Sequence, residues 1–104
     1  MSTSTALSAE AVIATLRAHE AELHESGIRH LALFGSVARG EAGADSDVDL
    51  VVEFDPAARM DLLKLVALER RLGTMLGCTV DILPEPVEKQ RLRANIERDR
   101  RHAF

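Results

Sequence analysis

Three aspartates stand out in this sequence because apolar residues flank each of them in segments typical of β-strands. Asp47 and Asp49 lie in DVDLVVEF (47–54), and Asp81 lies in TVDIL (79–83). Residues two apart on a strand point to the same side, roughly 6–7 Å from each other, so the first two carboxylates repel each other. A divalent cation relieves such repulsion, since Mg²⁺ prefers oxygen ligands. If the second segment pairs beside the first, Asp81 joins them, because neighbouring strands lie only ~4.8 Å apart.

Three carboxylates on two adjacent strands predict a two-metal site for phosphoryl transfer. An alternative needs no metal: Asp47 caps the start of a strand, and Asp49 faces solvent at the edge of a sheet. An Asp-x-Asp pair by itself does not separate these interpretations. The residues that precede the pair favour the metal site.

Those preceding residues contain a second feature, Gly35-Ser36, directly after the apolar run IRHLALF (28–34). We expect a short helical turn over 36–39. A glycine lets the backbone approach a bulky anion, and the amides at the start of a helical turn point toward it. The Ser36 hydroxyl adds a donor, and Arg39, one turn on, adds a positive charge. The pattern predicts a phosphate-binding turn; a glycine-rich turn that only reverses the chain is the alternative.

A P-loop is excluded in this segment, although Gly35 and Gly40 have the spacing with which that motif begins. The motif continues with Lys and then Ser or Thr, whereas this chain continues with Glu41 and Ala42. The cation that contacts the phosphates and the hydroxyl that contacts the metal are therefore both missing.

Hydrophobic periodicity and turn residues predict an alternation of helices and strands around these motifs. Apolar positions three and four apart indicate helices, and alternating or continuous apolar runs indicate strands. The expected order is a helix at 9–26, a strand at 28–34, a strand at 47–54, a helix at 61–76, a strand at 79–83 and a helix from 87 to about 102. This order predicts an α/β fold with a small three-stranded sheet and crossover connections.

The composition agrees with one domain over 1–104. The chain has 104 residues, of which 46% are hydrophobic and 29% are charged. At this length folding hides roughly two-thirds of the surface of the unfolded chain, so we expect one modest core and an active site in an open cleft. The net charge of −4 lacks the basic field of non-specific nucleic-acid binders, and we expect no direct nucleic-acid partner.

The charges are unevenly distributed: residues 89–104 carry a net +4 and residues 1–88 a net −8. The basic last helix predicts a surface for a partner, and a charged helix that is merely solvated is the alternative. Its basic residues are Lys89, Arg91, Arg93, Arg98, Arg100 and Arg101.

The location of the protein is indicated by the lone Cys78, which allows no disulfide within the chain and is typical of a reducing compartment. The first seven residues lack the basic and apolar segments of an export signal. No apolar run approaches the ~20 residues that span a bilayer. We therefore expect a cytoplasmic protein that does not enter membranes.

Together, these features resemble the nucleotidyltransferase superfamily typified by polymerase beta. Its Gly-Ser-x₁₀-Asp-x-Asp signature matches LFGSVARGEAGADSDVDLVVEF (33–54), with Asp81 in the place of the third carboxylate. The short length and the Gly-Ser-x-x-Arg-Gly and Ser-Asp-x-Asp-Leu forms are most similar to the minimal nucleotidyltransferases, the MntA-like antitoxins encoded beside HEPN-domain toxins. The resemblance covers the chain from about 28 to 96.

The resemblance implies a polymerase beta-like fold, a mixed sheet flanked by helices, and a role for each residue of the motif. Gly35 and Ser36 would hold the triphosphate of ATP. Asp47 and Asp49 would bind two Mg²⁺ ions. Asp81 would be a third metal ligand and a general base toward the incoming hydroxyl.

The resemblance also implies an activity and a partner. The activity is transfer of AMP from ATP onto a hydroxyl, with Tyr as the first candidate, of a HEPN toxin encoded nearby, in a type VII-like toxin–antitoxin pair that forms a hetero-oligomer. The chain has no Tyr and shows no second domain of the kind with which larger relatives hold an acceptor, so we expect the acceptor to come from elsewhere. Two alternatives stay open: an idle antitoxin that neutralises its toxin by binding, and transfer to a small molecule such as an aminoglycoside.

Overall fold

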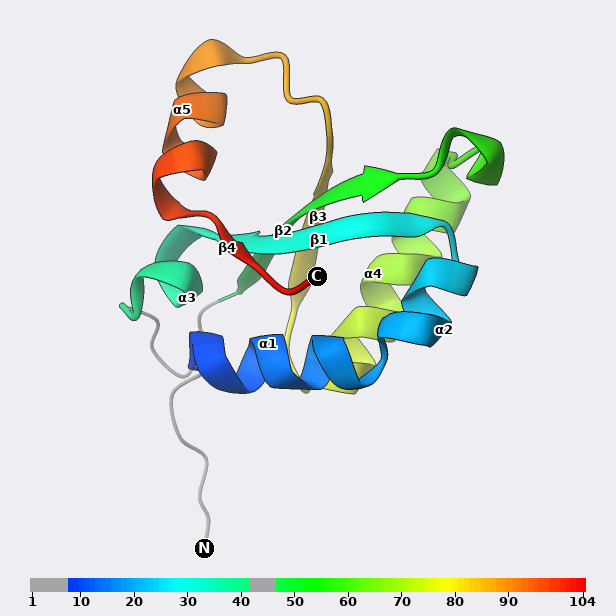
Figure 1. The fold of residues 1–104 in the computed structure, drawn as a ribbon, viewed down its shortest axis with the longest axis horizontal. Coiled ribbons are helices and arrows are strands. Elements are labelled where there is room, and N and C mark those ends of the chain that lie inside the picture. The colour runs from blue at the N-terminus through cyan, green and yellow to red at the C-terminus, as the bar shows by residue number, and fades with distance from the viewer. Residues whose placement is uncertain (1–7, 42–46) are drawn as a thin grey trace, which may run out of the picture.

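A four-stranded mixed β-sheet in the order β3-β2-β1-β4 forms the centre of this computed structural model, which describes residues 8–41 and 47–104 (Figure 1). The strands are β1 (Ile28–Phe34), β2 (Val48–Phe54), β3 (Val80–Pro84) and β4 (Arg101–His102). The helices are α1 (Ala9–Ala18), α2 (Glu20–Glu25), α3 (Gly35–Arg39), α4 (Leu62–Leu76) and α5 (Gln90–Asp99), with a 3₁₀ turn, η1 (Pro56–Ala58). Within the described residues, no helix is both long and apolar enough to cross a bilayer.

The strand directions follow from the connections between the strands. β1 and β2 pair antiparallel, whereas β2 and β3 pair parallel with α4 as the crossover helix. β4 pairs antiparallel with the other side of β1. The predicted mixed α/β architecture and the crossover are confirmed. The predicted three-stranded sheet is wrong, because the C-terminal residues supply a fourth strand.

The last helix is shorter than the predicted span from 87 to about 102. α5 ends at Asp99, and Arg100 adopts an extended backbone conformation (φ −58°, ψ 129°). β4 then pairs with Ala32 and Leu33 of β1. The free edge of β1 offers backbone hydrogen-bond partners to the tail, and the periodicity of the tail alone does not reveal them.

The predicted first helix (9–26) is divided into α1 and α2. At His19 the backbone leaves helical geometry (φ −107°, ψ 18°), and its amide donates to the Leu16 carbonyl three residues earlier. Leu16 and Leu23 are both fully buried, on either side of the break. The apolar spacing thus continues through a break in the helix, which is why the sequence predicts a single helix here.

The two faces of the sheet pack against different helices. Val48, Leu50 and Val52 of β2 point into the main core, which α1, α2 and α4 complete. The opposite face carries a smaller apolar cluster that includes Val51 and, from α5, Ile96. In Figure 1, α1 lies below the sheet and α5 above it. The predicted alternation along β2 is confirmed, and it directs the carboxylates to the α5 face.

The crossover helix α4 begins and ends where its sequence indicates. The Asp61 side chain accepts a hydrogen bond from the Lys64 amide (2.8 Å), which satisfies one free amide of the first turn. Gly77 follows the helix in a left-handed conformation (φ +73°) and ends it. Because α4 returns the chain to the same end of the sheet, β2 and β3 run parallel and their carboxylates lie at the same level.

Candidate active site

The parallel pairing of β2 and β3 places two predicted site residues side by side. Asp49 is in register with Asp81, and adjacent strands lie only ~4.8 Å apart. Their strand neighbours Leu50 and Ile82 point into the main core, so the two carboxylates point to the opposite face. Asp49 is half-buried and Asp81 is exposed. The register brings the two acids together as expected, while their catalytic role stays a prediction.

The electrostatic environment of Asp49 shows how the carboxylates act on one another. Partial burial raises the pKa of Asp49, and the negative charges of Asp81 and Asp47 raise it further. The positive charge of Arg39 acts in the opposite direction without cancelling the effect. Asp47 is exposed just before β2, so it adds negative charge at the solvent side. The site therefore favours the approach of a positive charge.

Gly35 lies on the other side of Asp49, because it follows Phe34 of β1, which is in register with that aspartate. The backbone of Gly35 is left-handed (φ +80°), and a Cβ atom built there would lie 2.5 Å from Asp49 Oδ2. Glycine meets both requirements, since it adopts positive φ at no steric cost and leaves room for the carboxylate. Gly35 directly after β1, Asp49 in β2 and Asp81 in β3 thus form a row across the sheet.

The predicted helical turn after this row is confirmed as α3. Gly40 ends α3 in a left-handed conformation (φ +77°). At its start, Phe34 supplies no side-chain cap, so within the described residues the first turn keeps free amides. Ser36 is half-buried at this start. Free amides at the start of a helical turn attract anionic oxygens, and binding of a nucleotide by Ser36 stays a prediction.

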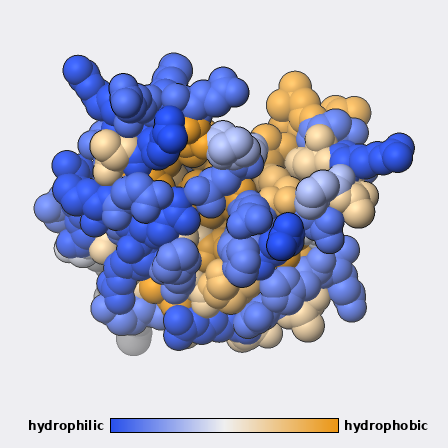
Figure 2. Space-filling view, turned by 45° about the horizontal axis from the view of Figure 1, so that its top comes forward, coloured by the Kyte–Doolittle hydropathy of each residue, from blue (hydrophilic) through white to orange (hydrophobic). Residues whose placement is uncertain are grey.

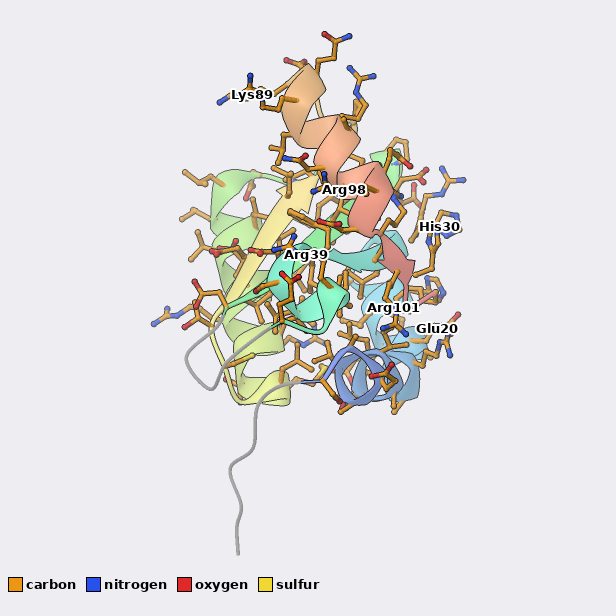
Figure 3. The ribbon with its side chains drawn as sticks, turned by 90° about the vertical axis from the view of Figure 1, so that its left-hand side faces the viewer. Glu20, His30, Arg39, Lys89, Arg98 and Arg101 are labelled. Carbon is orange, nitrogen blue, oxygen red and sulfur yellow. The ribbon has the colours of Figure 1, made fainter. Side chains whose placement is uncertain are left out.

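Arg39 is held by two carboxylates in the structure. Its Nε donates to Glu41 Oε1 (2.9 Å), and its Nη1 donates to Asp99 Oδ2 (2.8 Å). In Figure 3, Arg39 lies below Arg98, whose Nε also donates to Asp99 (3.2 Å). The Glu41 side chain is 63% exposed, whereas that of Asp99 is 5% exposed. The bonds to Glu41 and Asp99 use two of the five N–H groups of the guanidinium, so Arg39 can donate to a phosphate while it stays paired, and binding of a phosphate by Arg39 stays a prediction.

Asp99 is the residue near the site that sequence reasoning missed. It lies 60 positions from Arg39, in a segment notable for its basic charge. Hydrogen bonds from Arg98 lower the pKa of Asp99 most, and those from Arg39 lower it further. One signal was present: Asp99 follows the buried Ile96 by three residues, which places it on the inner face of α5.

The donor set of the site fits a hard cation such as Mg²⁺. The candidate ligands are carboxylate oxygens, and their mutual repulsion is relieved by a cation. Among residues 8–41 and 47–104, no three acidic, His or Cys side chains form a finished cage for an ion. Mg²⁺ commonly takes one or two carboxylates together with waters and substrate phosphates, so an incomplete protein cage is compatible with its binding.

A mixed sheet that places two carboxylates beside a Gly-Ser turn is the arrangement expected of an enzyme that transfers nucleotides. Residues 16–103 match the family model described as Nucleotidyltransferase domain. The chain belongs to this family, and the prediction of a nucleotidyltransferase is confirmed.

Individual relatives support the narrower resemblance to minimal nucleotidyltransferases. The protein adenylyltransferase MntA of Thermococcus cleftensis is 38% identical over 94 residues, which cover 89% of this chain and 93% of that protein. A solved structure assigned as a minimal nucleotidyltransferase is 36% identical, with a TM-score of 0.74 and coverage of 91% and 95% of the two chains.

A more distant solved structure shares the fold alone. It comes from the complex of a tri-AMPylated HEPN toxin with an MNT antitoxin from Shewanella oneidensis. The match has a TM-score of 0.63 at 17% identity and covers 88% of this chain and 71% of that one.

The two left-handed glycines that flank α3 allow a matched test of the site geometry. Gly35→Ala and Gly40→Ala both force a side chain into positive φ, which costs about 1–2 kcal/mol. Only Gly35→Ala also drives a Cβ against Asp49, because a Cβ at Gly40 meets no atom of another described residue within 4 Å, its chain neighbours aside. We expect Gly35→Ala to lose more unfolding free energy in urea titrations and to lose nucleotide binding. Equal losses in the two variants would show that Gly35 is an ordinary turn residue.

Asp49→Asn tests the electrostatic account of the site through the pH dependence of stability. Because the pKa of Asp49 is raised in the folded state, the folded protein holds this proton more tightly than the unfolded chain, and stability falls as pH rises through the two pKa values. In EDTA at neutral pH we expect Asn to raise the unfolding free energy by up to about 1 kcal/mol, the scale of one like-charge strand pair.

The gain from Asp49→Asn should disappear below the ordinary Asp pKa of 3.8, where both states are protonated. The exposed Glu88 provides the control, and Glu88→Gln should leave stability unchanged at both pH values. A clear destabilisation by Asp49→Asn at neutral pH would identify Asp49 as a structural residue instead.

Proposed function

We propose that this nucleotidyltransferase is a Mg²⁺-dependent protein adenylyltransferase that moves AMP from ATP onto a side-chain hydroxyl, with Tyr as the first candidate, of a HEPN toxin encoded nearby. The modification silences the toxin, so that the chain is the antitoxin of a type VII-like pair. The observation that carries this proposal is the register of Asp49 with Asp81 beside Gly35. A site of this kind serves transfer of a phosphorus group from a nucleotide.

The comparisons support the choice of AMP and of a protein acceptor. The Thermococcus relative is named as a protein adenylyltransferase, and the Shewanella complex joins an AMPylated HEPN toxin to an MNT antitoxin. These are properties of those proteins, and we extend them to this chain as a proposal. The lone Cys78 also agrees with the reducing cytoplasm, where we place the pair.

The nucleotide is bound by residues from the row and from α3. Asp47, Asp49 and Asp81 would hold Mg²⁺, which neutralises charge on the triphosphate and on the pyrophosphate product. Gly35 lets the phosphates approach the backbone, and the Ser36 hydroxyl donates a hydrogen bond to a phosphate oxygen.

Transfer requires one bond to form and one to break. The acceptor oxygen forms a bond to the α-phosphorus of ATP, and the bond from that phosphorus to the oxygen bridging to the β-phosphate breaks. Pyrophosphate leaves with the electron pair of that bond. The hydroxyl proton goes to the exposed Asp81 carboxylate, which lies at the outer side of the pair. Asp49 is less suited to this role because it is enclosed between Asp81 and Gly35.

Ion pairs with acidic side chains of the same chain neutralise part of the basic tail, so fewer of its basic residues are available to a partner. Arg98 pairs with Asp99, Arg100 with Glu85, and Arg101 with Glu10.

The remaining basic residues lie in the first half of the tail segment: Lys89, Arg91 and Arg93 are exposed and pair with no acidic side chain of the described residues. Figure 3 shows Lys89 at the end of α5 that projects from the body of the molecule. We propose that this half of α5 contributes to the toxin interface, and that the second half serves the fold.

The decisive test of the function combines the chain with ATP, Mg²⁺ and the product of the adjacent gene, and weighs both proteins by intact mass spectrometry. We expect the partner alone to gain the mass of one AMP or a small multiple. Asp49→Asn should slow the gain at least ~100-fold, on the scale of losing one charged group of a transfer site, and Glu88→Gln should not. Tight binding without a mass change would instead support the idle antitoxin.

A further inference from the structure

β3 forms an open edge of the sheet among residues 8–41 and 47–104, where β2 is the one strand beside it. The Thr79 carbonyl accepts a hydrogen bond from the Val48 amide (2.9 Å), and the Glu85 amide donates to the Val52 carbonyl (2.8 Å). Successive residues of a strand direct their backbone groups to opposite edges. The odd-numbered residues therefore face β2, and the backbone groups of residues 80, 82 and 84 face outward.

A side chain, and not a strand, occupies this edge. The Ile82 amide donates to Glu69 Oε2 of α4 (2.9 Å). Pro84 has no amide hydrogen, so it presents only a carbonyl. The carboxylate of Glu69 thus stands where the carbonyl of an added strand would lie. An added strand would therefore have to replace Glu69 at the Ile82 amide and could pair with Pro84 only through its carbonyl.

A groove of about 530 Å³ follows this edge, between α4 and the start of β3. Val66, Gly73 and Thr74 line it from α4, and the carboxylate residue Asp81 lines it from β3. Val66 also joins the groove to an apolar patch at the start of α4.

Leu62 and Leu63 complete that patch, with 73% and 82% of their surface exposed. Figure 2 shows hydrophobic colour gathered at the upper right, over this end of the molecule. The groove therefore connects an apolar surface with Asp81 of the proposed site.

We propose that the acceptor segment of the partner protein binds in this groove as an extended strand, paired to the open edge of β3, with its hydroxyl side chain beside Asp81. Side chains at the same level of neighbouring strands lie about 4.5–5.5 Å apart at their Cβ atoms. An acceptor residue level with Asp81 extends the row across the sheet, so that the hydroxyl, Asp81, Asp49 and Gly35 follow one another. This inference rests on the proposed function and adds the place and conformation of the substrate.

The geometry also specifies the chemistry of the acceptor segment. Residues on both sides of the hydroxyl residue point to the opposite face, toward α4, because strand side chains alternate. They meet Val66 and the small Gly73, which favours apolar side chains at these two positions. The body of the partner then covers the exposed Leu62, which lies one helical turn before Val66 on the same face of α4.

Two tryptophan variants of α4 test the docking site. Thr74→Trp fills the groove from an exposed position. Ala67→Trp adds the same bulk at another exposed position, in the hollow lined by Lys64 and Arg71. With the adjacent-gene toxin as substrate, we expect Thr74→Trp to raise KM for the toxin at least ~10-fold with KM for ATP unchanged, as blocking a binding surface does. Ala67→Trp should change neither constant.

Glu69→Ala and Glu69→Gln test whether the hydrogen bond from the Ile82 amide to Glu69 competes with an added strand. Removal of the carboxylate frees the Ile82 amide, so Glu69→Ala should lower KM for the toxin several-fold. Gln keeps an acceptor oxygen and should give an intermediate value. Unchanged KM in both, or an effect of Ala67→Trp equal to that of Thr74→Trp, would overturn the docking site and leave the proposed function intact.

Hydrogen exchange of the wild-type complex gives a readout that does not depend on transfer. Toxin binding should slow exchange of the outward-facing Val80 amide, in the presence or absence of ATP. If the toxin binds without accepting AMP, the proposed function fails, and protection of Val80 alone decides the docking site. Binding without that protection, or no binding, would overturn the docking site.

Discussion

The repulsion between the Asp49 and Asp81 carboxylates is the constraint on which the rest of the structure depends. The strand positions of the two residues are fixed next to each other, because Leu50 and Ile82 anchor the same strands in the main core. Among the described residues, Arg39 offsets their charge only in part, since it bonds to Glu41 and Asp99. The fold therefore maintains concentrated negative charge at its surface, which agrees with the proposed binding of a cation together with a triphosphate.

The sheet places the residues of the proposed site in a row that crosses its strands. Gly35 lies at one side, where the backbone must come close to Asp49, and Asp81 lies at the other side beside an open edge. In the proposed reaction, nucleotide and acceptor would approach from opposite sides of the carboxylates, which suits an in-line displacement. Asp99 supports this arrangement from α5, because it holds Arg39 near the row without contributing to it.

The parts of this site that depend on local sequence were predictable, and those that depend on tertiary contacts were not. The spacing of Asp47 and Asp49 and the turn at Gly35 follow from strand alternation and glycine chemistry. The division of the first helix at His19 left its apolar spacing intact, so periodicity could not show it. β4 and the Arg39–Asp99 pair join residues far apart in the sequence, and only the folded chain brings them together.

Titration calorimetry of ATP binding, with Mg²⁺ and then with EDTA, tests the central claim most directly. Because uncompensated carboxylates repel a triphosphate, we predict that Mg²⁺ tightens ATP binding at least ~10-fold, which corresponds to ~1.4 kcal/mol. Asp49→Asn should reduce this dependence, since it removes one of the charges that the cation neutralises. Equal affinity for ATP in Mg²⁺ and in EDTA would contradict the account, because it would show that these carboxylates do not bind ATP through a cation.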